Sequence, residues 1–111
     1  MLDEQQFRDL ADTALDSLVR ALEHAADQYD FEVDRNAGAI SIEFDNPPAK
    51  FIVSPNAPVR QIWVSARVKS FKLDWNDQRS AFVLAADGRT LLELIAGVVG
   101  EQLGKPVSLN L

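Results

Sequence analysis

Several short runs of the sequence alternate apolar and polar residues, and this alternation constrains the fold more than any other feature. The clearest examples are Ile40–Asp45 and Gln61–Ser65. Because successive side chains of a strand point to opposite faces, Ile62 and Val64 share one side and Trp63 lies on the other. Such runs predict a sheet that is covered on one face only. A slip of one residue would expose both aliphatic side chains, so we expect Trp63 on the open face.

The alternating and β-branched runs predict six strands in all. They lie near residues 31–34, 40–45, 50–53, 61–65, 71–75 and 80–84. Turns or loops are predicted between them at 36–38, 46–48, 55–58 and 67–70. Two of these links contain prolines, which cannot donate a hydrogen bond to a strand ladder. The links are short, and short links favour antiparallel pairing of consecutive strands.

An amphipathic helix is predicted before the strands and another after them. The first spans residues 3–26, where apolar residues recur at steps of three and four. Its buried stripe is predicted to consist of Phe7, Ala11, Ala14, Leu18, Ala21, Leu22, Ala25 and Tyr29, widened by Leu10, Leu15 and Val19. The second begins at Thr90, which has capping-box spacing to Glu93, and it ends near residue 103 with Gly104 as C-cap.

Two amphipathic helices can both cover one face of a single sheet, so the expected fold is an α+β two-layer sandwich of α-β(6)-α order. The chain has no repeat or linker, and we expect a single domain over residues 1–111. Gly97 and Gly100 are unusual inside a helix; close packing of the second helix against the first helix or the sheet is one explanation, and the sequence leaves their role open. The tail at 107–111 is predicted to lie between the helices, and Trp75 is predicted to be buried.

Composition excludes several classes of protein. The chain has no cysteine, which removes disulfides, thiolate ligands and cysteine nucleophiles. No apolar run approaches the ~18 residues of a membrane span. Asp3 and Glu4 near the start argue against a targeting peptide, so we expect a cytosolic protein or a processed form. There is no recognisable catalytic Ser/His/Asp set, no glycine-rich phosphate loop, and a single histidine.

The net charge of −6 is unevenly distributed along the chain. Residues 1–45 carry twelve acids and three bases, whereas residues 46–111 carry five acids and eight bases. This uneven charge predicts that residues 1–45 bind a cationic partner or a metal cation, and it argues against nucleic acid as a partner. Surface carboxylates are hard donors that suit iron, manganese, magnesium or calcium, and on separate turns they would bind weakly. A solvated acidic face that only aids solubility remains an alternative.

The order of these elements and the residues in them resemble the frataxin family, in particular its bacterial type. The resemblance covers nearly the whole chain. Its most specific part is Pro58-x-x-Gln61-Ile62-Trp63-Val64-Ser65. Support comes from Leu15-Asp16-Ser17-Leu18 in the first helix and from Asp87-Gly88 before Leu91-x-Glu93-Leu94.

The resemblance implies a protein of iron–sulfur cluster assembly that binds iron (Fe²⁺ or Fe³⁺) weakly at its surface. It also implies docking on the complex of cysteine desulfurase and scaffold protein, as an iron donor or as a regulator. The acids that match the family's metal-binding positions are Asp12, Asp16, Glu23, Asp27, Asp30, Glu32 and Asp34. We expect partner binding by Asn56, Gln61, Trp63 and Ser65, of which Gln61 and Trp63 match the sheet-surface positions that contact the scaffold in the family.

Four residues depart from the family pattern. Arg20 and His24 stand where relatives usually have acids, although a histidine nitrogen is itself a possible ligand. Ser54 and Asn56 stand in place of a common Asn and a common Gln at one end of the scaffold contact.

Several expectations stay open at this point. The alternative function is a purely protein-binding regulator of the desulfurase with no iron role. Weak ferroxidase activity, claimed for some relatives, is neither supported nor excluded by the residues. We expect a monomer, with iron-driven oligomerisation undecided. The location is the cytoplasm if the chain is bacterial and the mitochondrial matrix if it is a processed eukaryotic form.

Overall fold

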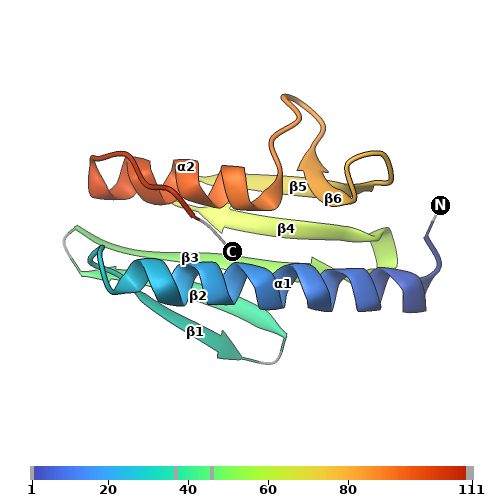
Figure 1. Ribbon diagram of the computed structural model, residues 1–111, viewed down its shortest axis with the longest axis horizontal. Helices are drawn as coiled ribbons and strands as arrows, with labels where there is room; N and C mark the ends of the chain where they lie inside the picture. Colours follow the sequence, from blue (N-terminus) through green and yellow to red (C-terminus); the bar gives the residue numbers. More distant parts are fainter. Residues whose placement is uncertain (1, 37, 46, 110–111) are drawn as a thin grey trace.

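The computed structural model of the protein describes residues 2–36, 38–45 and 47–109. Two helices lie side by side across the same face of a six-stranded antiparallel sheet (Figure 1). This arrangement confirms the predicted α+β two-layer sandwich. None of the helices in the described ranges combines the length and the apolar composition needed to cross a membrane.

The helices and strands follow in the predicted order. They are α1 (Glu4–Ala26), β1 (Glu32–Asn36), β2 (Ala39–Asp45), β3 (Pro48–Asn56), β4 (Gln61–Ala66), β5 (Lys69–Asn76), β6 (Ala81–Leu84) and α2 (Leu91–Leu103). A single 3₁₀ turn, η1 (Ala57–Val59), joins β3 to β4. The strands lie in the sheet in sequence order, each antiparallel to its neighbours.

A capping box fixes the start of α1. The backbone N–H of Gln6 donates to the Asp3 carboxylate over 2.8 Å, and the Asp3 N–H donates to the Gln6 amide oxygen over 3.0 Å. These bonds satisfy two backbone donors that a helix N-terminus leaves free. The buried face of the helix consists of Phe7, Ala11, Leu15, Leu18, Ala21, Leu22 and Ala25. It confirms most of the predicted stripe, although Ala14 and Tyr29 are only half-buried.

The sheet turns its alternating apolar residues toward the helices. The fully or almost fully buried strand residues include Ile40, Ile42, Phe44, Phe51, Val53, Ile62, Val64 and Leu73. Trp63, between two buried neighbours, keeps 37% of its surface exposed on the opposite face. The orientation predicted from the alternation is therefore confirmed for β4.

All strands except β6, which begins one residue later than predicted, are longer than predicted, and three loop predictions were wrong. Pro48 is the first residue of β3, a position where the missing N–H is tolerated; Asn46 lies outside the described residues. Pro55 also belongs to β3, but it lies beyond Val53, the last β3 residue that pairs with β2. Its missing N–H therefore takes nothing from that ladder. The loop expected at 67–70 is only a two-residue turn, because β5 begins at Lys69.

The predicted capping box of α2 is confirmed. The Thr90 hydroxyl accepts from the Glu93 N–H over 3.3 Å, and the Thr90 N–H donates to the Glu93 carboxylate over 2.9 Å. Gly104 ends the helix in the left-handed conformation with φ 71°. The role of Gly100, which the sequence left open, follows from the position of the tail, because a Cβ there would lie 3.0 Å from the carbonyl oxygen of Lys105. The glycine makes room for the chain after α2, not for α1 or the sheet.

The tail after α2 turns back over that helix in Figure 1. Val107 and Leu109 pack against the hydrophobic core, and Val107 lies beside Gly100 of α2. Asn110 and Leu111 lie outside the described residues.

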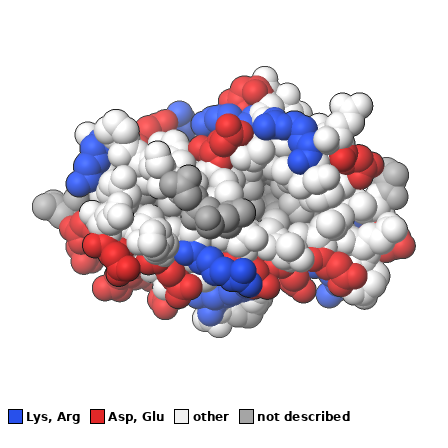
Figure 2. Space-filling view, viewed as in Figure 1, with Lys and Arg blue, Asp and Glu red and all other residues white. Residues whose placement is uncertain are grey.

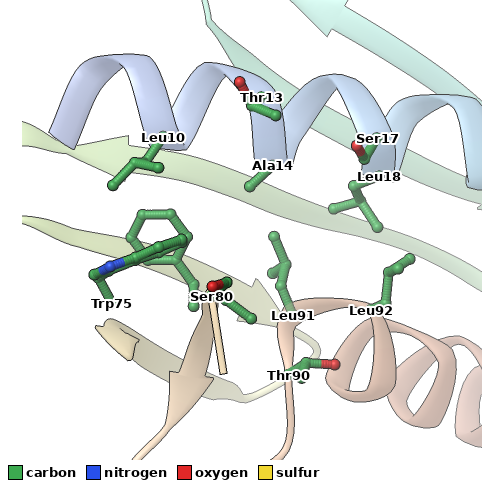
Figure 3. A pocket seen from close by; sticks show the side chains of 12 residues that line it. Leu10, Thr13, Ala14, Ser17, Leu18, Trp75, Ser80, Thr90, Leu91 and Leu92 are labelled. Carbon is green, nitrogen blue, oxygen red and sulfur yellow. The ribbon is translucent and has the colours of Figure 1, made fainter. Parts of the chain in front are cut away.

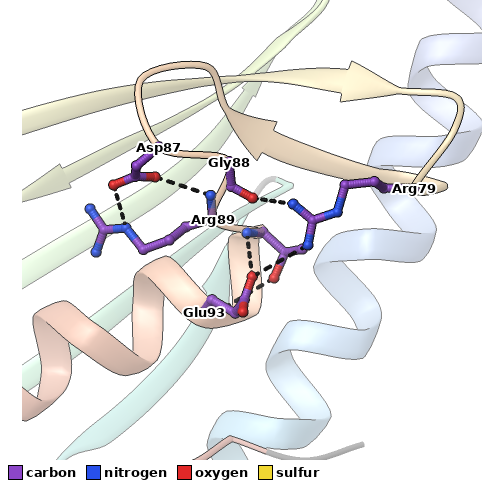
Figure 4. A network of polar contacts seen from close by, with 6 residues as sticks. Arg79, Asp87, Gly88, Arg89 and Glu93 are labelled. Atoms are coloured by element: carbon purple, nitrogen blue, oxygen red, sulfur yellow. Dashed lines mark hydrogen bonds and ion pairs between the residues drawn. The ribbon is translucent and has the colours of Figure 1, made fainter.

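A polar network ties the start of α2 to the loops around it (Figure 4). The Arg89 N–H and guanidinium donate to Asp87 over 3.0 and 2.8 Å. Arg79 donates to the Gly88 carbonyl, and its guanidinium lies 3.7 Å from the Glu93 carboxylate. The backbone N–H of Arg89 lowers the pKa of Asp87, and the N–H of Thr90 lowers the pKa of Glu93.

Candidate functional site: the open sheet face and the acidic edge

The face of the sheet that no helix covers carries all four predicted partner-binding residues. Gln61, Trp63 and Ser65 alternate with buried residues along β4. In the register with β3, Asn56 is the Cα partner of Gln61, so the two side chains share this face. We call these four residues together with Lys72 and Asp74 of β5 the open-face patch.

The Trp63 indole is held in place by its neighbours in the open-face patch. Its Nε1 donates to the Gln61 amide oxygen over 2.9 Å, and the Gln61 amide nitrogen donates to Asp74 over 3.1 Å. Lys72, directly across from Trp63 on β5, places its Nζ 4.9 Å from the indole centroid. The indole is therefore exposed and also oriented, which reduces the side-chain entropy that binding would cost.

A shallow hollow of about 300 Å³ lies beside the indole. Its lining includes Ile52, Ser54, Ser65 and Lys72. An apolar side chain of a partner could enter this hollow next to the indole, while the polar groups around it accept or donate hydrogen bonds. An apolar centre inside a polar rim is the usual composition of a protein interface.

Sequence reasoning missed Ile52, Lys72 and Asp74 as members of this surface. The strand predicted at 71–75 already placed Lys72 and Asp74 on the face opposite Leu73. The pairing register of β4 with β5 was not predicted. In the structure it places Lys72 opposite Trp63 and Asp74 opposite Gln61. A turn of only two residues between β4 and β5 would have fixed that register, but a longer loop was predicted there.

The seven predicted metal-binding acids are all exposed. In Figure 2 acidic side chains follow the lower edge of the molecule, along α1 and β1, and basic side chains interrupt them. We call this set, Asp12, Asp16, Glu23, Asp27, Asp30, Glu32 and Asp34, the acidic edge. Arg20 and His24 are exposed on α1 among these acids.

The register of β1 divides the acidic edge between two faces. Glu32 and Asp34 pair with Glu43 and Ser41 of β2, whose side chains point to the open face. The α1 acids belong to the helix layer on the other side of the sheet. Arg35, on the helix-facing side of β1, forms an ion pair with Asp16. Among residues 2–36, 38–45 and 47–109, no three His, Asp or Glu side chains lie close enough to hold one metal ion.

A second pocket, of about 300 Å³, lies apart from both surfaces, between α1, the β5–β6 hairpin and the start of α2 (Figure 3). Leu10 and Ala14 of α1 face Trp75 and Leu91 across it. Trp75 is only half-buried here, so its predicted burial was wrong. Its indole packs on Phe82 with centroids 5.2 Å apart and lines the pocket together with Leu10 and Ala14.

Comparisons with known proteins agree with this architecture. A family model described as a frataxin-like domain matches residues 1–105. The iron-sulfur cluster assembly protein CyaY of Azotobacter vinelandii is 33% identical over 106 residues, which cover 94% of this chain and 92% of that protein. The protein of the same name from Cupriavidus taiwanensis is 32% identical over 111 residues, covering 98% and 97%.

A solved structure matches the fold over its full length. Frataxin from Psychromonas ingrahamii superposes with a TM-score of 0.84, covering 99% of this chain and 100% of that chain. The two sequences are 20% identical, so this likeness shows the fold alone.

Proposed function

Because the chain belongs to the frataxin-like family, we propose that it serves iron–sulfur cluster assembly by docking on a cysteine desulfurase–scaffold complex. The observation that carries this proposal is the Trp63 indole, exposed on the open sheet face and held there by Gln61 and Lys72. The names of the relatives support the pathway. These relatives are bacterial proteins. Their origin supports the cytoplasm, and not the mitochondrial matrix, as the location of this protein.

The open-face patch is the part of the surface that meets the scaffold protein. Exposed tryptophans are frequent anchors of interfaces, and truncating such an anchor commonly costs 2 kcal/mol or more, roughly 30-fold in affinity. The acidic edge supplies a negative potential that attracts a basic desulfurase surface and orients the approach.

The docking test compares Trp63→Ala with wild type for binding to a purified desulfurase–scaffold complex. We expect affinity to fall roughly 30-fold while the melting temperature stays nearly unchanged. Val68→Ala, which truncates a side chain 99% exposed at the β4–β5 turn, is the matched control and should bind like wild type. Equal affinity of Trp63→Ala and wild type would remove the open-face patch from the interface.

Iron is the proposed cargo of the acidic edge. The donors are exposed carboxylates, which are hard oxygen ligands and would leave most of the ion's waters in place. Such a site binds weakly and exchanges its ion easily, which suits delivery and is poor for a permanent cofactor.

The second candidate is a regulatory module that docks on the desulfurase and carries no iron. Anaerobic Fe²⁺ titration of the free protein, followed by NMR, separates the two. Selective broadening at Glu23, Asp27 and Glu32 supports the iron role. Uniform or absent changes favour the docking module. The ion pair of Asp16 with Arg35 favours the same candidate, because it neutralises one of the acids.

A further inference from the structure

One residue of the β3–β4 connection holds a backbone conformation that its type rarely adopts. Arg60 follows η1 with φ 55° and ψ 43°, in the left-handed region. This conformation closes the turn, because the Arg60 N–H donates back to the Ala57 carbonyl over 3.1 Å. Glycine takes such a conformation without steric strain, whereas an arginine is strained there. The presence of an arginine is therefore explained by what its side chain does.

The Arg60 guanidinium joins the start of α1 to η1. Its Nε donates to the Leu2 carbonyl over 3.3 Å, and a terminal nitrogen donates to the carbonyls of Ala57 and, over 3.5 Å, Pro58. Leu2 immediately precedes Asp3, the N-cap of α1, and Figure 1 shows this end of the helix beside the β3–β4 connection. A guanidinium presents its donors in a rigid fork, so it can bind several carbonyls at once. The arginine therefore ties this turn to the helix layer.

The turn that Arg60 holds carries a residue of the open-face patch at each end. Asn56 immediately precedes η1, Gln61 immediately follows Arg60, and Asn56 and Gln61 are Cα partners in the register of β3 with β4. The Gln61 amide oxygen in turn accepts the Trp63 indole N–H over 2.9 Å. The orientation of the indole therefore depends on where the turn places the Gln61 backbone.

We propose that Arg60 is a positioning residue of the open-face patch. By fixing η1 it holds Gln61, and through Gln61 it holds the Trp63 indole in the orientation that a partner meets. The inference rests on the docking function proposed above. An indole that is not held has to be ordered when the partner binds, so we expect removal of the Arg60 side chain to lower affinity about three- to tenfold.

The test uses Arg60→Gly, which removes the guanidinium and keeps a residue that accepts the left-handed backbone. Arg67→Gly is the matched control, because Arg67 also has a left-handed φ, of 59°, and lies in the turn at the other end of β4. Both variants lose one positive charge and one strained side chain. In the free proteins, NMR measures hydrogen exchange of the Trp63 indole N–H with water. Binding to the purified desulfurase–scaffold complex is measured for each variant, alone and combined with Trp63→Ala.

We expect the Trp63 indole N–H to exchange faster in Arg60→Gly than in wild type or Arg67→Gly. Affinity should fall about three- to tenfold in Arg60→Gly and stay within about twofold of wild type in Arg67→Gly. In the Trp63→Ala background, Arg60→Gly should cause no further loss, because the arginine acts through the indole.

Unchanged indole exchange in Arg60→Gly, or an equal loss of affinity with and without the indole, would overturn the inference. Failure of the docking function shows differently, because Trp63→Ala alone would then bind the complex like wild type. Indole exchange in the free protein would in that case still decide whether Arg60 holds the ring.

Discussion

Adjacent residues of β4 serve the core and the surface in turn. Ile62 is fully buried against the helices, whereas Trp63 exposes part of its ring on the other face. We expect Ile62→Ala to destabilise the protein by about 2–5 kcal/mol, because it leaves a cavity in a packed core. Trp63→Ala should cost less than about 1 kcal/mol, as for most surface changes. Urea unfolding measures both, and a similar loss for the two would place the indole in the core.

At the scale of single residues, the sequence predicted well which face of the sheet a side chain takes. It predicted poorly which side chains of different elements contact one another. Alternation reports which face a side chain takes, so Trp63 and the buried residues of β4 could be placed. The ion pair of Asp16 with Arg35 could not, because it depends on how α1 sits over the sheet edge. The contact of Lys72 with the indole depends on register in the same way.

At the scale of elements, side chains do not completely fill the space between α1, the β5–β6 hairpin and the start of α2. Ala14 faces the pocket beside Trp75, whereas Ala11, one turn earlier, is buried with 1% exposure. Leu and Ala are both strong helix formers, so replacing each alanine with leucine mainly tests packing. We expect Ala14→Leu to stabilise the protein by about 0.5–1 kcal/mol and Ala11→Leu to destabilise it by about 1–3 kcal/mol. Thermal unfolding checks this, and destabilisation by both would mean that the pocket cannot accept a larger side chain.

The start of α2 should make stability depend on pH. The Thr90 N–H, with smaller contributions from the Thr90 hydroxyl, Arg79 and Arg89, lowers the pKa of Glu93 in the folded state. A lowered folded pKa gives stabilisation that is present above the unfolded value of about 4.3 and is lost as pH falls through the folded value.

Glu93→Gln tests this dependence, because glutamine can still accept the Thr90 N–H but carries no charge. We expect its deficit in melting temperature to be largest near neutral pH and to shrink toward pH ~3. Glu101→Gln, in the last turn of the same helix, is the control for removal of a charge away from the cap. A deficit of constant size from pH 7 to 3 would contradict a role for the carboxylate charge.

Both helix starts and the order of all elements could be predicted, because caps and periodicity are local properties. Strand ends could not. Proline does not by itself end a strand: Pro55 lies beyond Val53, the last residue of β3 that pairs with β2, but it is still the Cα partner of Ile62 in β4. The role of Gly100 was likewise invisible, because it depends on where the chain travels after α2.

The acidic edge is a property of the whole molecule, and it was only partly predictable. Composition showed that the first 45 residues hold most of the acids. It could not show that β1 turns Glu32 and Asp34 to the open face while the α1 acids stay in the helix layer. The negative charge therefore wraps around one edge, and both a partner on the open face and one at the helices would be exposed to it.

This distribution of acids predicts that partner binding depends on where a charge lies on the molecule, and not only on the net charge. Glu23→Lys and Glu101→Lys change the net charge equally, but the first lies on the acidic edge and the second in the last turn of α2. If the edge steers a basic desulfurase, Glu23→Lys should slow association roughly tenfold at low salt, whereas Glu101→Lys should have a much smaller effect. The difference should disappear near 1 M salt, where the screening length is about 3 Å. Stopped-flow association rates across this salt range decide the matter, and equal slowing by the two variants would show that the edge acts only through the total charge.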